Sequence, residues 1–157
     1  MSNELSTPKL CVCPSDFQGR QIASAFSVNA STRWEADATQ NNTNVSYFIG
    51  VNAVDTFPQS LLSGDRNVGA GTAGNNSVAG ATPGYAVSPA AQSYQNPMNS
   101  AGSTSTNAPV AAWQDNGHQK QGNVLLGDAS VQGWSIAGLR SGLVNSGNTG
   151  NNAIAFP

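Results

Sequence analysis

The sequence predicts a β-rich α+β fold, an antiparallel sheet with a C-terminal hairpin, a short helix and long irregular loops. Three observations predict it. Residues 45–52 alternate as a strand does, residues 123–134 fit a hairpin around a Gly-Asp turn, and residues 136–143 carry apolar side chains at helical spacing. At 157 residues the chain has the length of one domain, so we predict a single globular domain over residues 1–157.

The composition favours an exported protein over one that binds nucleic acid. Only 9% of the residues are charged and the net charge is −2, whereas about a quarter are charged in an average soluble domain. Asn, Ser, Thr, Gly and Ala take the place of the missing charges, as in many β-rich proteins that form assemblies. The opening residues MSNELSTPKL lack the apolar run of a secretory signal or a membrane helix.

The clearest predicted strand spans Val45–Asn52. Its alternation places four apolar residues on one face and Phe48 on the other, so we expect both faces to be covered. Those four residues are Val45, Tyr47, Ile49 and Val51. A second strand is predicted at about Ser60–Val68, with a Gly-Asp pair as its turn signal.

An insert rich in Gly, Ser, Asn and Ala occupies residues 69–109. It holds too little apolar surface to offset its ordering entropy unless it packs against the rest of the domain. We expect Tyr85 and Tyr94 to tether it. The stretch GAGTAG lacks the Lys-Ser/Thr pair that follows in a phosphate-binding loop, so no nucleotide site is predicted.

The C-terminal hairpin is predicted with Gly127–Ser130 as a two-residue turn. In that register Leu126 faces Val131, and both share one apolar face with Val124. This face should pack against the core.

A short helix should follow the hairpin. Ser135 is a plausible N-cap, and Ile136, Leu139 and Leu143 fall at helical spacing. Residues 145–152 are then a loop, and AIAFP is a last strand or a tail.

His118 is the only histidine, and Asp128 follows it after nine residues. The two could form a catalytic pair, half a metal site or a structural clasp. Catalysis would need an activated Ser or Cys, and no Gly-x-Ser-x-Gly pattern occurs. We favour the clasp, in which His118 bonds a backbone carbonyl or the Asp128 carboxylate.

The sequence predicts no cofactor and no tightly bound metal. Cys11 and Cys13 are read as free thiols, because a Cys-x-Cys disulfide is strained. Zinc needs two further soft ligands and only His118 is available. Calcium is the weaker alternative, since the acids are scattered and Asp65 with Arg66 reads as a turn. If a calcium site existed, its ligands would come from Asp65, Asn67, Asp115 and Asp128.

His118 followed by GNVLLGDASVQ resembles the signature of a bacterial pilin-like family. This is the prepilin-processing-associated family named for a His, nine residues and Asp-Gly, which is abundant in planctomycetes and verrucomicrobia. CPSD (Cys13 to Asp16) resembles the block near the start of the family's globular part. The stretch that ends in SGDRN, with Asp65 and Arg66, resembles its central strand pair, and Trp113 precedes the histidine at a matching distance.

The resemblance implies a pseudopilin-like structural subunit, without catalysis, in a type II secretion or type IV pilus class filament. Its globular domain would be extracytoplasmic, with an inner-membrane anchor in a full-length form. Partners would be other pilin-like subunits, including further copies of this chain, or secretion-machinery proteins. The N-terminal membrane helix of such subunits packs on one sheet face, so this chain should expose an apolar patch there.

The chain departs from the family in two respects. The FTLIEL-type processing site and its apolar helix are missing, which indicates a trimmed form or a partial gene product. Ala129 follows Asp128 where the family has Gly. Ala at a positive φ costs about 1 kcal/mol or more, so a type I turn with a bulge is the alternative to the two-residue turn.

Two functions of other classes compete with the structural one. An exported surface- or carbohydrate-binding β-module would expose a row of aromatics drawn from Trp34, Trp113 and Trp134, of which we expect at least one to be buried. A small hydrolase would hold His118 in a deep pocket beside a hydroxyl or thiol.

Overall fold

The structure is a computed structural model, and it describes eight stretches of the chain. These are residues 2–16, 22–23, 26, 44–71, 96–98, 110–115, 117–147 and 152–155. The expected tethers Tyr85 and Tyr94, and also Trp34, lie outside the described residues.

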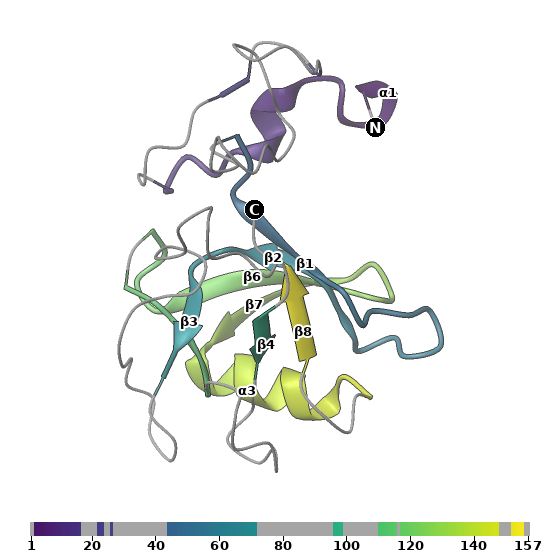
Figure 1. The fold of residues 1–157 in the computed structure, drawn as a ribbon, viewed down its shortest axis with the longest axis vertical. Coiled ribbons are helices and arrows are strands. Elements are labelled where there is room, and N and C mark those ends of the chain that lie inside the picture. Colours follow the sequence, from purple (N-terminus) through teal and green to yellow (C-terminus); the bar gives the residue numbers. More distant parts are fainter. Residues whose placement is uncertain are drawn as a thin grey trace.

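A six-stranded antiparallel sheet forms the centre of the described structure (Figure 1), in the order β4-β8-β1-β2-β6-β7. Its strands are β1 (Tyr47–Gly50), β2 (Leu61–Asp65), β4 (Asn96–Met98), β6 (Gln121–Leu126), β7 (Val131–Ser135) and β8 (Asn152–Ala155). A second sheet pairs β3 (Val68–Ala70) with β5 (Ala111–Trp113). The helical segments are α1 (Ser2–Leu5), η1 (Pro8–Cys11) and α3 (Ile136–Asn145). The predicted β-rich antiparallel architecture is confirmed.

The core lies between the main sheet and α3, with β5 at its side. Two aromatic rings of the core pack so closely on a neighbouring strand that a side chain there would clash with them. A Cβ at Gly64 would lie 2.7 Å from the Phe48 ring, and one at Gly122 would lie 2.6 Å from the Trp113 ring. Phe48 and Trp113 are therefore fully buried against bare backbone.

Helix α3 forms as the sequence predicts. The Ser135 side chain accepts a hydrogen bond from the Gly138 N–H at 3.3 Å, which satisfies one of the donors at the helix start. Ile136, Leu139 and Leu143 are all buried and line the core face of the helix. The segment AIAFP contributes a strand, β8, which resolves the choice between strand and tail.

The burial predicted for β1 is wrong. Phe48 is fully buried, whereas Ile49 is 60% exposed and Val51 also faces solvent. Because Gly64 lies opposite Phe48, the Phe48 face is the one that can approach the core closely. The predicted second strand also divides after Asp65, so that Val68 begins β3 in the other sheet.

The hairpin pairs one residue out of the predicted register. Leu125 faces Val131 and Val124 faces Gln132, so Val131 lies on the outer face and is 66% exposed. The shift arises because the turn has three residues. Ala129 adopts φ 66°, and its N–H donates to the Leu126 carbonyl. This matches the bulged alternative to the two-residue turn.

Replacing Ala129 with Gly should raise the free energy of unfolding by about 1 kcal/mol, because Gly adopts positive φ without the steric cost that Ala incurs. Ala129 is exposed, so no packing is lost. Urea unfolding measures the change. The matched control is Ala137→Gly on the exposed side of α3, which should lower stability by about 1 kcal/mol. Equal losses in both variants would show that the turn is not strained at Ala129.

The outer face of the sheet carries an apolar row across five strands. Strand register places its members directly opposite one another, and such partners point to the same face. The apolar row is Ala155, Ile49, Ser63, Leu125 and Val131. Its one polar member, Ser63, is half-buried, and its hydroxyl donates to the Phe48 carbonyl at 2.8 Å.

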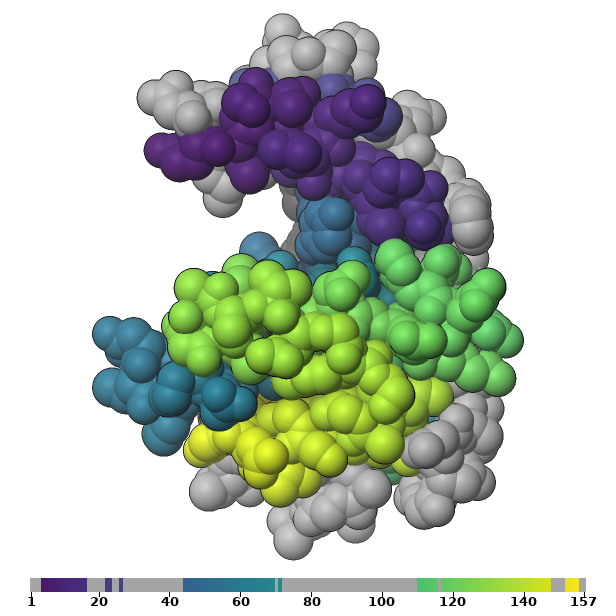
Figure 2. Space-filling model, turned by 180° about the vertical axis from the view of Figure 1, so that it is seen from behind, coloured from purple at the N-terminus to yellow at the C-terminus, as the bar shows by residue number. Residues whose placement is uncertain are grey.

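Residues 2–16 lie beyond this outer face, on the side of the sheet opposite α3 (Figure 1). Figure 2 shows a hollow between this N-terminal segment, in purple, and the body of the domain. Within the described stretches, no helix is both long and apolar enough to span a bilayer.

Candidate functional site

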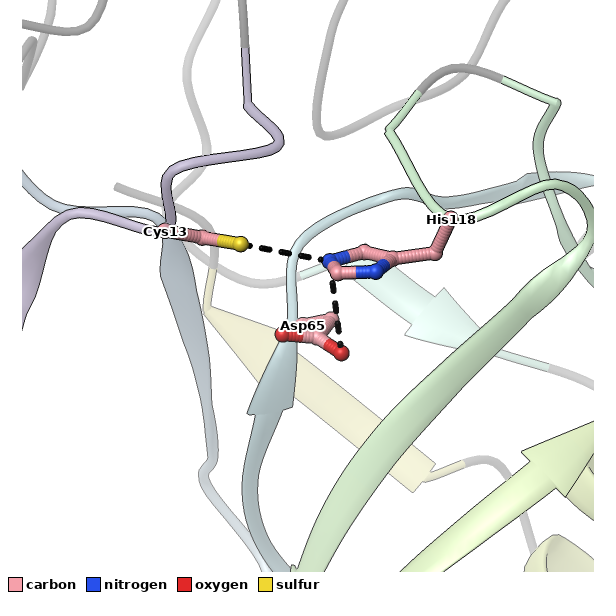
Figure 3. A group of neighbouring side chains, drawn as sticks. All are labelled: Cys13, Asp65 and His118. Atoms are coloured by element: carbon pink, nitrogen blue, oxygen red, sulfur yellow. Dashed lines mark hydrogen bonds and ion pairs between the residues drawn. The ribbon is translucent and has the colours of Figure 1, made fainter.

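Three side chains from distant parts of the sequence meet where the N-terminal segment joins the sheet (Figure 3). Cys13 follows η1, Asp65 ends β2, and His118 lies in the loop before β6. The Cys13 Sγ is 3.3 Å from the His118 Nε2, and that same nitrogen is 3.7 Å from the Asp65 Oδ2. We call these three residues the Cys-Asp-His cluster. Their ligand atoms all lie within 4.8 Å of one another.

Strand pairing holds Asp65 in place. Its Oδ2 accepts a hydrogen bond from the Asn123 backbone N–H at 2.7 Å and a second from the Asn123 Nδ2 at 3.2 Å. Asp65 is buried, so these two bonds replace the water that its carboxylate loses on folding. The neighbouring strand β6 therefore fixes the direction of the carboxylate.

A tight loop holds His118. Gly117, Gln119 and Lys120 all adopt positive φ around it. The Lys120 N–H donates to the Gln114 carbonyl at 3.2 Å, and the Gln121 N–H donates to the His118 carbonyl at 3.1 Å. The loop thus turns the imidazole toward Asp65 and leaves its side chain 25% exposed.

A buried ion pair attaches the N-terminal segment beside the cluster. The Arg66 Nε donates to the Asp16 Oδ2 at 2.7 Å, and the two side chains are only 5% and 4% exposed. The backbone supports this attachment, because the Ser46 N–H donates to the Cys11 carbonyl at 2.8 Å. Asp16 and Arg66 thereby join residues 2–16 to the sheet.

A small cavity opens among these residues, with a volume of about 10 Å³. It is lined by Cys13, Asp16, Ser46, Asp65, Arg66, Asn67 and His118. That is room for about one water molecule or one ion. Two of these lining residues carry a buried polar atom, Ser46 Oγ and Asn67 Oδ1, that has no hydrogen-bond partner within the described part of the chain.

The orientation of the Asn67 amide follows from its other bonds. Its Nδ2 donates to the carbonyls of Gln114 and Gln121, at 3.3 and 3.0 Å. Both partners are acceptors, so the nitrogen must face them and the Oδ1 is the atom left over. The cavity lining therefore offers two unused oxygens.

The contact between His118 and the Cys13 thiol is one that a hydrolase would need, but the arrangement differs from a catalytic triad. In a nucleophile-His-acid triad the nucleophile and the acid bond different ring nitrogens. Here Cys13 and Asp65 both approach Nε2. The arrangement can share a proton or hold one small ligand.

The expected pairing of His118 with Asp128 is wrong. The six residues of β6 separate them, and at about 3.3 Å per residue they lie about 20 Å apart at opposite ends of the strand. The Asp128 Oδ1 instead accepts from the Ser130 N–H at 2.9 Å. This bonding to Ser130 lowers the pKa of the Asp128 carboxyl. Asp128 is a turn residue.

The other predicted site residues separate into two groups. Cys13, Asp16, Asp65, Arg66 and Asn67 converge around the cavity with His118. Trp113 lies in the core, and Asp115 is exposed on the surface, where it pairs with Lys120 at 3.8 Å. Asp115 and Asp128 are thus removed from the predicted ligand set of Asp65.

Burial affects two ionisable neighbours of the cluster. It raises the pKa of the Tyr47 phenol, and the nearby Asp65 carboxylate raises it further. Burial also raises the pKa of the Cys11 thiol. Both groups therefore stay protonated at neutral pH and add no charge beside Asp65.

The contact that sequence reasoning missed is the one between Cys13 and His118, which are 105 positions apart. One signal pointed to it. CPSD, SGDRN and the stretch around His118 all resemble motifs of the same pilin-like family.

No family model, no curated protein and no solved structure matches this chain.

Replacing His118 with Ala should lower the free energy of unfolding by about 1–3 kcal/mol, because it removes the partner of the buried Asp65 and Cys13. Urea unfolding measures the loss. Lys120→Ala is the control from the same loop, and its exposed ion pair should be worth no more than about 1 kcal/mol. Equal small changes in both variants would show that His118 contributes no more than a surface residue.

Proposed function

We propose that this chain is the globular domain of a pilin-like structural subunit, in a filament of the type II secretion or type IV pilus class. In this proposal the domain is displayed outside the cytoplasmic membrane and a full-length form is anchored in the inner membrane. The observation that carries the proposal is the apolar row on the outer face of the sheet. Its two most exposed members, Ile49 and Val131, are 60% and 66% exposed.

The apolar row suits a surface that another helix or subunit covers. Core side chains and α3 cover one face of the sheet, so the domain does not need the other face for its own core. Large contiguous apolar patches are uncommon on monomeric proteins and often mark interaction sites. The expected partner is a helical segment of the next pilin-like subunit in the filament.

The attachment of residues 2–16 supports the same proposal. A filament subunit must transmit the position of its N-terminal segment to the globular domain. The buried Asp16–Arg66 pair and the Cys-Asp-His cluster hold that segment to the edge of the outer face. The Cys-Asp-His cluster lies at the junction between the two parts (Figure 3).

The two competing functions have less support. The geometry at His118 differs from a catalytic triad. For a carbohydrate-binding module, the described residues offer a single exposed aromatic, Phe57. Trp113 is fully buried, as expected of at least one tryptophan, and Trp134 packs against the core.

Site-specific photocrosslinking in cells that produce the full-length protein tests the proposal. A crosslinker at Ile49 should give a ladder of subunit multiples, because the outer face meets the neighbouring subunit. Val144 is the matched control, since it is 57% exposed and lies on α3, on the other side of the sheet. The proposal fails if Ile49 gives no ladder, or if Val144 gives the same one.

A further inference from the structure

We propose that the Cys-Asp-His cluster is a zinc site, with Cys13 Sγ, a carboxylate oxygen of Asp65 and His118 Nε2 as its three protein ligands. This goes beyond the structural role above, and it replaces the sequence-based expectation of no metal. That expectation considered only His118 and the two thiols as ligands. The fold brings Cys13 and His118 together and places the Asp65 carboxylate beside them.

Two of the three ligand-atom separations are close to those around one tetrahedral ion. Zinc lies about 2.3 Å from sulfur and about 2.0–2.1 Å from nitrogen or oxygen, so tetrahedral neighbours are about 3.3–3.6 Å apart. The observed separations from His118 Nε2 are 3.3 Å to sulfur and 3.7 Å to oxygen, and the sulfur and the oxygen lie within 4.8 Å of each other. Cys13 and Asp65 both approach the same ring nitrogen. This arrangement does not suit a proton relay through the imidazole, but three ligands that share one ion require it.

The surroundings supply what a fourth ligand needs. A cavity of about 10 Å³ has room for one ion, and two of its lining residues, Ser46 and Asn67, each carry a buried oxygen without a partner in the described part of the chain. These two oxygens are the candidates for the fourth ligand. Asn123 supplies outer support, because it bonds the Asp65 carboxylate and holds its direction.

The donor set selects zinc over calcium. The thiolate is a soft ligand, the imidazole is borderline and the carboxylate is hard, and zinc binds such mixed sets in four-coordinate sites. Calcium takes six to eight oxygens, and a single carboxylate cannot supply that shell. Cys13 binds as thiolate, so binding releases its proton to solvent.

Titration of the reduced, metal-free protein with Co²⁺, followed by competition with Zn²⁺, tests the proposal. Co²⁺ bound by this site should show tetrahedral d–d bands and a sulfur-to-cobalt charge-transfer band, and Zn²⁺ should displace both at one equivalent. Cys13→Ser should abolish the charge-transfer band. Cys11→Ser is the matched control, because Cys11 lies two residues away and outside the cluster, and it should leave the spectrum unchanged.

Affinity for Zn²⁺ by competition with a chromophoric chelator gives the second readout. His118→Ala should weaken binding by more than about 10–100-fold, the loss that outer partners of a metal ligand cause. His118→Cys should restore much of it, since a thiolate can replace the imidazole. If a variant fails to fold, the wild-type protein still decides, because Zn²⁺ should slow alkylation of Cys13 relative to Cys11. Absence of Co²⁺ bands in the wild type, or their loss in Cys11→Ser, would overturn the proposal.

Discussion

Replacing Asp16 with Ala should lower the free energy of unfolding by about 3–5 kcal/mol, one of the two largest effects that we expect. The substitution removes the carboxylate that bonds Arg66 at 2.7 Å, where both side chains are almost fully buried. Removing one member of a buried pair leaves the other charge without the compensation that its lost hydration demands. A protein with a total stability of about 5–15 kcal/mol would lose much of its margin.

Urea unfolding of Asp16→Ala measures this loss, and Asp115→Ala is the matched control. Asp115 also pairs with a cation, Lys120, but at 3.8 Å and in solvent, so its loss should cost no more than about 1 kcal/mol. If the two variants lose the same small amount, then Asp16 is not buried against Arg66, and residues 2–16 are not joined to the sheet in this way.

Replacing Trp113 with Ala should cost about 3–5 kcal/mol, because it empties the centre of the core. Trp113 is fully buried on β5, and its ring covers the bare backbone of Gly122 on β6. It therefore joins the small sheet to the large one. Thermal or urea unfolding measures the effect. Where fluorescence is the probe, the baselines of the variant are corrected for the tryptophan that it lacks.

Trp113→Phe is the control for Trp113→Ala. The Trp113 Nε1 is buried without a hydrogen-bond partner among the described residues. Phe lacks this donor, so the substitution breaks no hydrogen bond. Phe also fills most of the ring volume, and the loss should be clearly smaller than for Ala. Equal losses would mean that the indole nitrogen has a partner, or that the ring does not pack on Gly122.

Local elements could be predicted from the sequence because neighbouring residues determine them. Ser135 caps α3, and the spacing of Ile136, Leu139 and Leu143 sets its buried face. The strand at Tyr47–Gly50 follows from its alternation, but alternation does not say which face is buried when both are apolar. Phe48 is inside because Gly64, on another strand, makes room for it.

Register could not be predicted because it depends on one turn residue. The three-residue turn that ends at Ala129 moves Val131 to the outer face, and a one-residue shift always exchanges the two faces of a strand. The site shows the same limit. Its residues were found singly, but His118 was paired with Asp128 in sequence, whereas the fold pairs it with Cys13 and Asp65.

Hydrogen exchange at the Ser46 amide tests most directly whether the N-terminal segment is fixed to the sheet at the Cys-Asp-His cluster. That N–H donates to the Cys11 carbonyl at 2.8 Å and lies outside the pairing of β1 with its neighbours. We expect strong protection at Ser46, lost in Asp16→Ala, while the Leu126 amide, which donates to the Ser130 carbonyl across the β6–β7 hairpin, stays protected in both proteins. Exchange of the Ser46 amide at the rate of an unstructured peptide in the wild type would contradict the account.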